Sequence, residues 1–190
     1  MKDKIQGIAR ESIDVKSRFF EANAEVVADA AAMMIDAIKA GGKILIFGNG
    51  GSAADAQHIA AELVNRLNRD HPPIPAIALT TDTSIITSIA NDTSYDELFE
   101  RQVLALGRAG DVALAISTSG NSKNVLRGAK AGAERGMKTV ALTGKDGGEL
   151  GRAADIALIV RAESTQRIQE THITIGHILC ELIEDALYPA

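Results

Sequence analysis

The chain has 190 residues, a length that fits one domain with a single buried core. Its composition is that of a globular protein, 46% hydrophobic and 24% charged, and its net charge of −5 offers no basic surface for nucleic acid. No apolar run reaches the roughly 20 residues that a membrane span needs. The single cysteine, Cys180, cannot form an internal disulfide, and the first residues lack the apolar core of a signal peptide. We therefore expect a cytoplasmic protein with no nucleic-acid or membrane partner.

The pattern of apolar residues predicts a helical start followed by alternating strands and helices. In residues 1–40 apolar side chains recur at helical spacing, and Gly41-Gly42 ends that pattern. Five short apolar stretches, rich in β-branched residues, are predicted strands: Lys43 to Phe47, Ala76 to Leu79, Asp111 to Ile116, Thr139 to Leu142 and Ile156 to Val160. Helices are predicted at Ala53 to Leu67, Tyr95 to Leu106, Lys123 to Arg135 and Thr165 to Leu187.

This alternation predicts the fold class. Strands that are apolar throughout, separated by helices, indicate a parallel sheet buried on both faces. We expect an α/β three-layer sandwich with a doubly wound parallel sheet of about five strands. One domain would span residues 1–190, with residues 1–40 as an N-terminal helical segment and residues 41–190 as the α/β core. In such sheets ligands bind beyond the carboxyl ends of the strands.

Two loops at that edge have the composition of a phosphate site. Gly48-Asn49-Gly50-Gly51-Ser52 follows the first predicted strand, and Ser117-Thr118-Ser119-Gly120-Asn121-Ser122 follows the third. Each opens into a helix, so backbone N–H groups, hydroxyls and the helix dipole can favour an anion. Neither loop contains Lys or Arg, which suits a small phosphate monoester. The alternative is that Ser and Gly only cap helices and form tight turns.

Two helices carry titratable residues with suitable spacing for a site. His58 and Glu62 stand at positions i and i+4 of one helix, and Gln169 and His177 lie on a ridge of the last helix. These residues offer nitrogen and oxygen ligands for a divalent metal such as zinc, and Glu and His can also act as general base and acid. A hydrogen-bonded His/Glu pair and a structural histidine are the simpler alternatives, and His172 competes with His177. The pair Asn91-Asp92 precedes a predicted helix, so Asp92 could cap it or contact a substrate hydroxyl, and the sequence favours the cap.

These motifs together resemble the phosphoheptose isomerase family, whose members are single sugar-isomerase (SIS) domains. The likeness rests on the two loops, on His58 and Glu62, on Asn91-Asp92, on Leu142-Thr143-Gly144-Lys145-Asp146-Gly147-Gly148, and on Arg167-Ile168-Gln169-Glu170 with His172 and His177. It covers essentially the whole chain. It implies an aldose–ketose isomerase that converts sedoheptulose 7-phosphate into D-glycero-D-manno-heptose 7-phosphate through an enediol. That step begins the synthesis of nucleotide-activated heptose for the lipopolysaccharide core or other glycans.

The resemblance also implies roles for individual residues. It implies a cytoplasmic homotetramer with active sites near subunit contacts and one zinc ion per subunit, held by His58, Glu62, Gln169 and His177. Glu62 and His177 would be the acid/base pair, which selects His177 over His172. The substrate contacts would be Asn49, Gly50, Gly51, Ser52, Glu62, Asn91, Asp92, Ser117, Thr118, Ser119, Ser122 and Gln169.

Two other functions compete with this one. The first is a non-catalytic SIS protein of the type that associates with the bacterial replication initiator, which shares the pattern Leu-Cys-x-Leu-Ile found here at Leu179 to Ile183. Such relatives lack the active-site Glu and His, whereas Glu62 and His177 are present here. The second is a sugar-phosphate-sensing regulatory module, usually fused to a DNA-binding segment, and this sequence shows no such segment.

Overall fold

The computed structural model describes residues 1–189 and contains one parallel five-stranded sheet with the order β2-β1-β3-β4-β5. The strands are β1 (Ile44–Gly48), β2 (Ala76–Ala78), β3 (Val112–Ser117), β4 (Lys138–Gly144) and β5 (Ile156–Val160). All four pairings are parallel, and Gly48 lies beside Ile116 where β1 and β3 end. The predicted α/β fold with a doubly wound sheet is confirmed.

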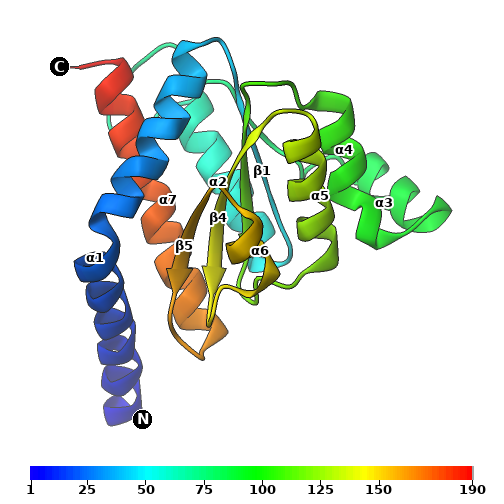
Figure 1. Ribbon diagram of the computed structural model, residues 1–190. Helices are drawn as coiled ribbons and strands as arrows, with labels where there is room; N and C mark the ends of the chain where they lie inside the picture. Colours follow the sequence, from blue (N-terminus) through cyan, green and yellow to red (C-terminus); the bar gives the residue numbers. More distant parts are fainter. Residues whose placement is uncertain (190) are drawn as a thin grey trace.

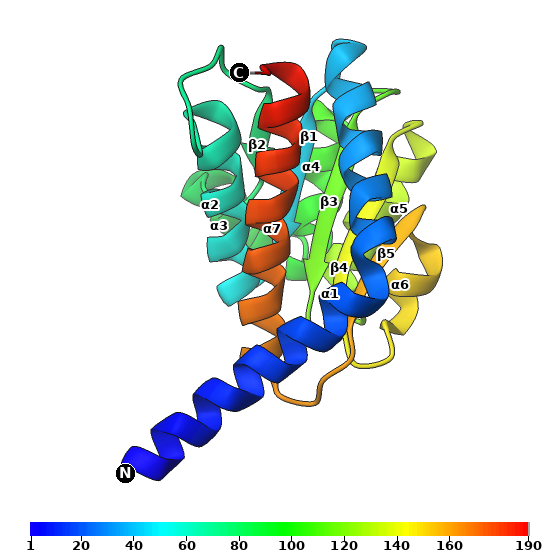
Figure 2. The ribbon, with the colours of Figure 1, turned by 90° about the vertical axis from the view of Figure 1, so that its left-hand side faces the viewer.

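Helices cover both faces of the sheet (Figure 1). The first face carries α1 (Lys2–Lys39), α2 (Gly51–Val64) and α7 (Thr165–Leu187), which stand side by side in Figure 2. The second face carries α3 (Thr83–Asp92), a 3₁₀ turn η1 (Tyr95–Glu97), α4 (Leu98–Leu106), α5 (Lys123–Glu134) and α6 (Gly148–Ala153). Within residues 1–189, no helix is both long and apolar enough to cross a membrane.

The core divides into two layers because alternate side chains of each strand point to opposite faces. In β1, Ile44 and Ile46 pack under α1, α2 and α7, whereas Leu45 and Phe47 pack under α4 and α5. Every residue of β1 and β3 is buried, which is why these strands are apolar throughout. The fully buried middle of the sheet therefore carries the two loops that follow β1 and β3.

Two helices were missed by the sequence analysis, and one predicted cap was wrong. α3 consists largely of Thr and Ile, which are weak helix formers, and it begins where Asp82 Oδ1 accepts a hydrogen bond from the Ile85 backbone N–H at 2.9 Å. α6 has only six residues. Asp92 ends α3 and receives a hydrogen bond from Asn91 Nδ2, and Ser94, not Asp92, caps the next turn.

The N-terminal part of α1, before Val15, projects beyond the body of the protein (Figure 2). Further along, Val15, Phe19 and Met34 are buried as α1 packs mainly against α7. The projecting part leaves three isoleucines in solvent, with exposures of 61% for Ile5, 45% for Ile8 and 65% for Ile13.

Candidate active site

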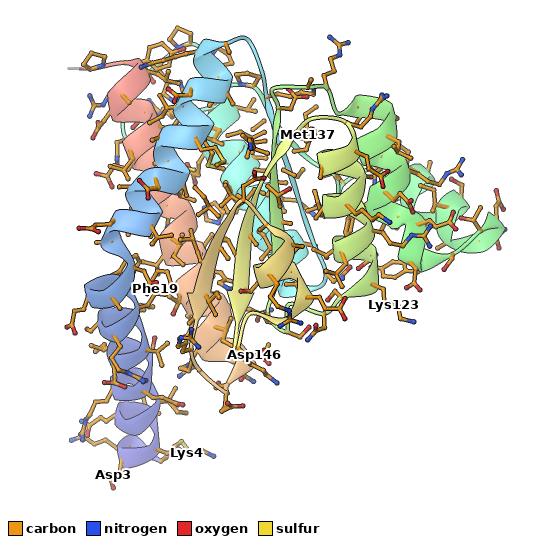
Figure 3. All side chains as sticks on the ribbon, in the orientation of Figure 1. Asp3, Lys4, Phe19, Lys123, Met137 and Asp146 are labelled. Carbon is orange, nitrogen blue, oxygen red and sulfur yellow. The ribbon has the colours of Figure 1, made fainter. Side chains whose placement is uncertain are left out.

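The two predicted phosphate loops meet at the carboxyl edge of the sheet. β1 and β3 are neighbours, and the chain continues to β2 on one side and to β4 on the other, so this is the point where the strand order reverses. Open α/β sheets bind ligands at such a point. Figure 3 shows the same edge at the bottom of the molecule, with Lys123 at the start of α5 and Asp146 in the loop after β4.

The second loop gathers three hydroxyl groups at the start of α5. Ser117 Oγ lies 3.0 Å from Ser122 Oγ and 3.5 Å from Ser119 Oγ. Ser122 is the N-cap residue of α5, yet its side chain makes no capping hydrogen bond, so its hydroxyl stays available to a ligand. The cluster therefore combines hydroxyl donors with the positive end of a helix, which favours a phosphate.

Backbone packing holds this loop in place. Gly120 has a φ of 66°, and a side chain there would collide with the carbonyl of Gly147 in the loop after β4. The backbone N–H of Leu150 donates to the Gly120 carbonyl at 2.9 Å, and that of Glu149 donates to Asn121 Oδ1 at 3.0 Å. The loop after β4 and the first turn of α6 thus hold the serine loop in place.

Asn49 of the first loop is fixed by two residues that the sequence analysis did not single out. Asn49 and the buried Asn124 of α5 exchange two side-chain hydrogen bonds of 2.8 and 2.9 Å. Tyr95 donates its hydroxyl to Asn49 Oδ1 at 3.1 Å. The only sequence signal for Asn124 is its position two residues after Ser122. Asn91 and Asp92 are exposed at the end of α3, three to four residues before Tyr95.

His58, Glu62 and His177 come together although they lie on two helices. His58 Nε2 is 2.9 Å from Glu62 Oε1 and 3.3 Å from His177 Nε2. One ligand atom from each residue lies within 4.8 Å of those of the other two. The cluster is open to solvent, since the side chains of His58 and Glu62 are 48% and 22% exposed.

Three of the four predicted ligands, His58, Glu62 and His177, lie close enough together to share a zinc ion. Two nitrogen ligands at about 2.0–2.1 Å from tetrahedral zinc stand ~3.3 Å apart, close to the separation of the two histidine nitrogens. A single shared proton can also bridge these atoms, so hydrogen bonding alone accounts for the same contacts. Gln169, the fourth predicted ligand, lies against Gly51, where a built Cβ would be 2.5 Å from its Nε2. Gly51 precedes His58 by seven residues, about 10 Å along α2, so this contact does not place Gln169 with the other three.

The burial of His172 distinguishes its role from that of His177. His172 is fully buried, its Nε2 lies 2.9 Å from the Thr143 carbonyl, and desolvation lowers its pKa from 6.5 to about 4. A neutral imidazole held in this way is structural. His177 is the histidine that faces His58.

Asp55 is a further carboxylate on α2, one turn before His58. Burial raises its pKa from 3.8 to about 6, against the opposing effect of His58, and its Oδ2 is buried without a hydrogen-bond partner among residues 1–189. Asp55, His58 and Glu62 follow one stripe of the helix at spacings of three and four.

The comparisons with known proteins identify the family. A family model described as SIS domain matches residues 9–144. Phosphoheptose isomerase from Aquifex aeolicus (strain VF5) is 54% identical over 185 residues, which cover 97% of each chain. This chain belongs to the phosphoheptose isomerase family.

Solved structures agree with this assignment. Phosphoheptose isomerase from Neisseria gonorrhoeae is similar with a TM-score of 0.91 and 45% identity, over 97% of this chain and 98% of that one. A phosphoheptose isomerase from Francisella tularensis has a TM-score of 0.93 at 39% identity, over 96% and 97% of the two chains. As a member of the phosphoheptose isomerases, the chain is an isomerase. The roles of individual residues stay predictions.

Proposed function

We propose that this chain is a phosphoheptose isomerase acting on sedoheptulose 7-phosphate and that Glu62 and His177 move the protons. The observation that carries the proposal is the meeting of His58, Glu62 and His177 in a chain 54% identical to an enzyme of that name. The product, D-glycero-D-manno-heptose 7-phosphate, would supply nucleotide-activated heptose for the lipopolysaccharide core or other glycans.

In this proposal the phosphate binds to the hydroxyls of Ser117, Ser119 and Ser122 at the start of α5. Hydrogen bonds to the dianion hold the substrate by a group remote from the reacting carbons, and that binding energy serves orientation. Thr118, Asn49, Gly50, Gly51, Ser52, Asn91, Asp92 and Gln169 are the further proposed contacts. The position of Gln169 against Gly51 supports its place among them.

Isomerisation requires one group for the carbon-bound proton and another for the oxygens. We assign the carboxylate of Glu62 to the proton that leaves C1 and returns at C2, and His177 to proton exchange with the two oxygens of the enediol. Glu62 Oε1 faces His58 Nε2, where the proposed metal would also lie, which leaves Oε2 as the base. One oxygen can thus be held while the other reacts.

A zinc ion is part of the proposal, with one ion per chain. His58, Glu62 and His177 would hold it, and Gln169 is the proposed fourth ligand. When bound, zinc acts as a Lewis acid that polarises the sugar carbonyl and stabilises negative charge on its oxygen. The distances among the nitrogen and oxygen atoms support the site, and metal analysis is its test.

A homotetramer in the cytoplasm is the remaining part of the proposal. The cluster is open on the single chain, so a neighbouring subunit would exclude water from it. The exposed isoleucines of α1 offer an apolar surface for such contacts. Analytical ultracentrifugation should give four chains per particle, and a double change Ile8→Glu with Ile13→Glu should reduce that number. A monomeric wild-type protein would contradict this part.

The non-catalytic alternative is not favoured. The relatives and solved structures reported above are named as isomerases at 39–54% identity, and the two residues that the alternative lacks are both in the cluster. The deciding experiment incubates the purified chain with sedoheptulose 7-phosphate and follows the C1 proton of the aldose by NMR. The proposal requires the aldose signal to grow, and its absence with zinc present would refute the activity.

A further inference from the structure

The two helices that supply the cluster run side by side in the same direction (Figure 2). Gln169 of α7 lies against Gly51 of α2, and Gly176 lies against Ile59. A Cβ on Gly176 would be only 2.6 Å from Ile59 Cδ1, so the missing side chain lets the helices approach beside His177. This contact is apolar and therefore has little directional preference. It brings the helices together through shape alone, with no charge in the contact.

A directional contact exists at the other end of the pair. Glu184 of α7 is 1% exposed, and its carboxylate accepts hydrogen bonds from three consecutive backbone N–H groups just after α2 ends. The donors are Leu67 at 3.3 Å, Asn68 at 3.2 Å and Arg69 at 3.2 Å. Consecutive N–H groups that point at one anion form a nest, in which both charge and direction count.

Aromatic groups close this contact from the outside. His71 Nε2 lies 3.3 Å from Glu184 Oε1, and both side chains are only 1% exposed. The ring of Tyr188 stacks on that of His71, with 5.3 Å between the ring centres and 2° between the planes. The carboxylate is therefore shielded from water. In such a buried environment hydrogen bonds to a charged group are strong, and losing one is costly.

We propose that Glu184 is a positioning residue that fixes α2 relative to α7, and so sets the separation of His58 and Glu62 from His177. Glu184 follows His177 by seven residues, about 10 Å along the helix. Leu67 follows Glu62 by five residues. A weak thiol hydrogen bond from Cys180 to the Ile59 carbonyl, at 3.9 Å, lies nearer the cluster, and the nest is the charged tie between the two helices. The consequence for activity rests on the function proposed above.

The test replaces Glu184 by Gln. The variant E184Q keeps the size of the side chain, removes its charge and turns an NH₂ group toward backbone donors. We expect zinc affinity to fall by about tenfold, the lower end of the effect of removing a group that hydrogen-bonds a metal ligand directly, because Glu184 acts through the packing of the helices. In the metal-free protein, we expect a weaker NMR cross-peak between the ring protons of His58 and His177.

Asp185→Asn is the matched control. Asp185 is the adjacent residue, its side chain is 50% exposed, and it pairs with Arg69 of the same segment. An exposed ion pair contributes little, so this variant should keep the wild-type zinc affinity and cross-peak. Glu184→Asp provides a second test if E184Q does not fold. It keeps the charge but shortens the side chain. The loss of zinc affinity and the weakening of the cross-peak should therefore be smaller than in E184Q.

The outcomes separate positioning from plain stability. A folded E184Q or E184D that unfolds more easily, yet binds zinc as tightly as the wild type and keeps the cross-peak, would show that Glu184 only stabilises the fold. An inactive wild type in which E184Q still weakens zinc binding and the cross-peak would refute the proposed function and support the positioning role.

Discussion

The Nε2 atoms of His58 and His177 lie 3.3 Å apart although 119 residues separate them in the chain. Neither helix forms a site by itself: α2 contributes His58 and Glu62, and α7 contributes His177. Their packing places two imidazoles and a carboxylate at one point between the two helices. Each proposed role of this cluster leads to a separate test.

The zinc proposal predicts that metal binding depends on His58. The wild-type protein, purified without chelators, should contain about one zinc per chain, and His58→Ala should lose most of it without unfolding, because His58 is exposed at 48%. Gln57→Ala, a change at the neighbouring exposed position, should keep the metal. Metal analysis decides the question. Full turnover in a zinc-free preparation that added zinc does not alter would remove zinc from the mechanism.

The acid/base proposal predicts large losses of kcat in two isosteric variants. Glu62→Gln and His177→Gln should each lower kcat by at least ~10²-fold, the usual effect of losing a general acid or base. Glu181→Gln removes an exposed carboxylate of α7 and should leave kcat within about twofold of the wild type. Circular dichroism controls for folding. A folded Glu62→Gln variant with normal turnover would exclude Glu62 as the base.

The serine cluster predicts that affinity depends on the phosphate. Ser119→Ala or Ser122→Ala should weaken substrate binding by about 1–3 kcal/mol, the effect of losing a hydrogen bond to a charged group. Ser88→Ala on exposed α3 is the control and should leave KM unchanged. Inorganic phosphate should compete with the substrate. If sedoheptulose without phosphate reacts equally well, the loops do not bind phosphate.

The buried His172 predicts a loss of stability in acid. Its pKa is about 4 in the folded protein and ordinarily 6.5, so unfolding takes up a proton between these values. The free energy of unfolding should therefore be unaffected by this group above pH 6.5. It should fall as the pH drops toward 4, with a slope of up to about 1.4 kcal/mol per pH unit.

His172→Gln checks this assignment, because Gln can still donate to the Thr143 carbonyl but does not titrate. Urea unfolding at a series of pH values should show a shallower slope below pH 6.5 for the variant. At pH 7–8 the two proteins should differ only by a constant offset, which serves as the internal control. Equal slopes for both proteins would mean that other groups cause the acid sensitivity.

The sequence by itself was enough to predict the sheet and most of the helices. The five strands were predicted to within one or two residues at each end. The predicted bounds of the last helix, Thr165–Leu187, are those of the structure. Buried parallel strands are apolar throughout, and the helices between them repeat at 3.6 residues, so both signals are local. The resemblance based on the motifs was also correct at the level of the family.

Only the tertiary structure decided which polar residues meet. Spacing along α2 places Glu62 beside His58, but nothing local pairs them with His177 or sets Gln169 against Gly51. The tie between Asn49 and Asn124, and that between Glu184 and the backbone after α2, join residues 75 and more than 110 positions apart. α3 was missed because a single cap at Asp82 outweighs its weak helix formers. Such contacts depend on how whole helices pack, and packing is absent from any short stretch of sequence.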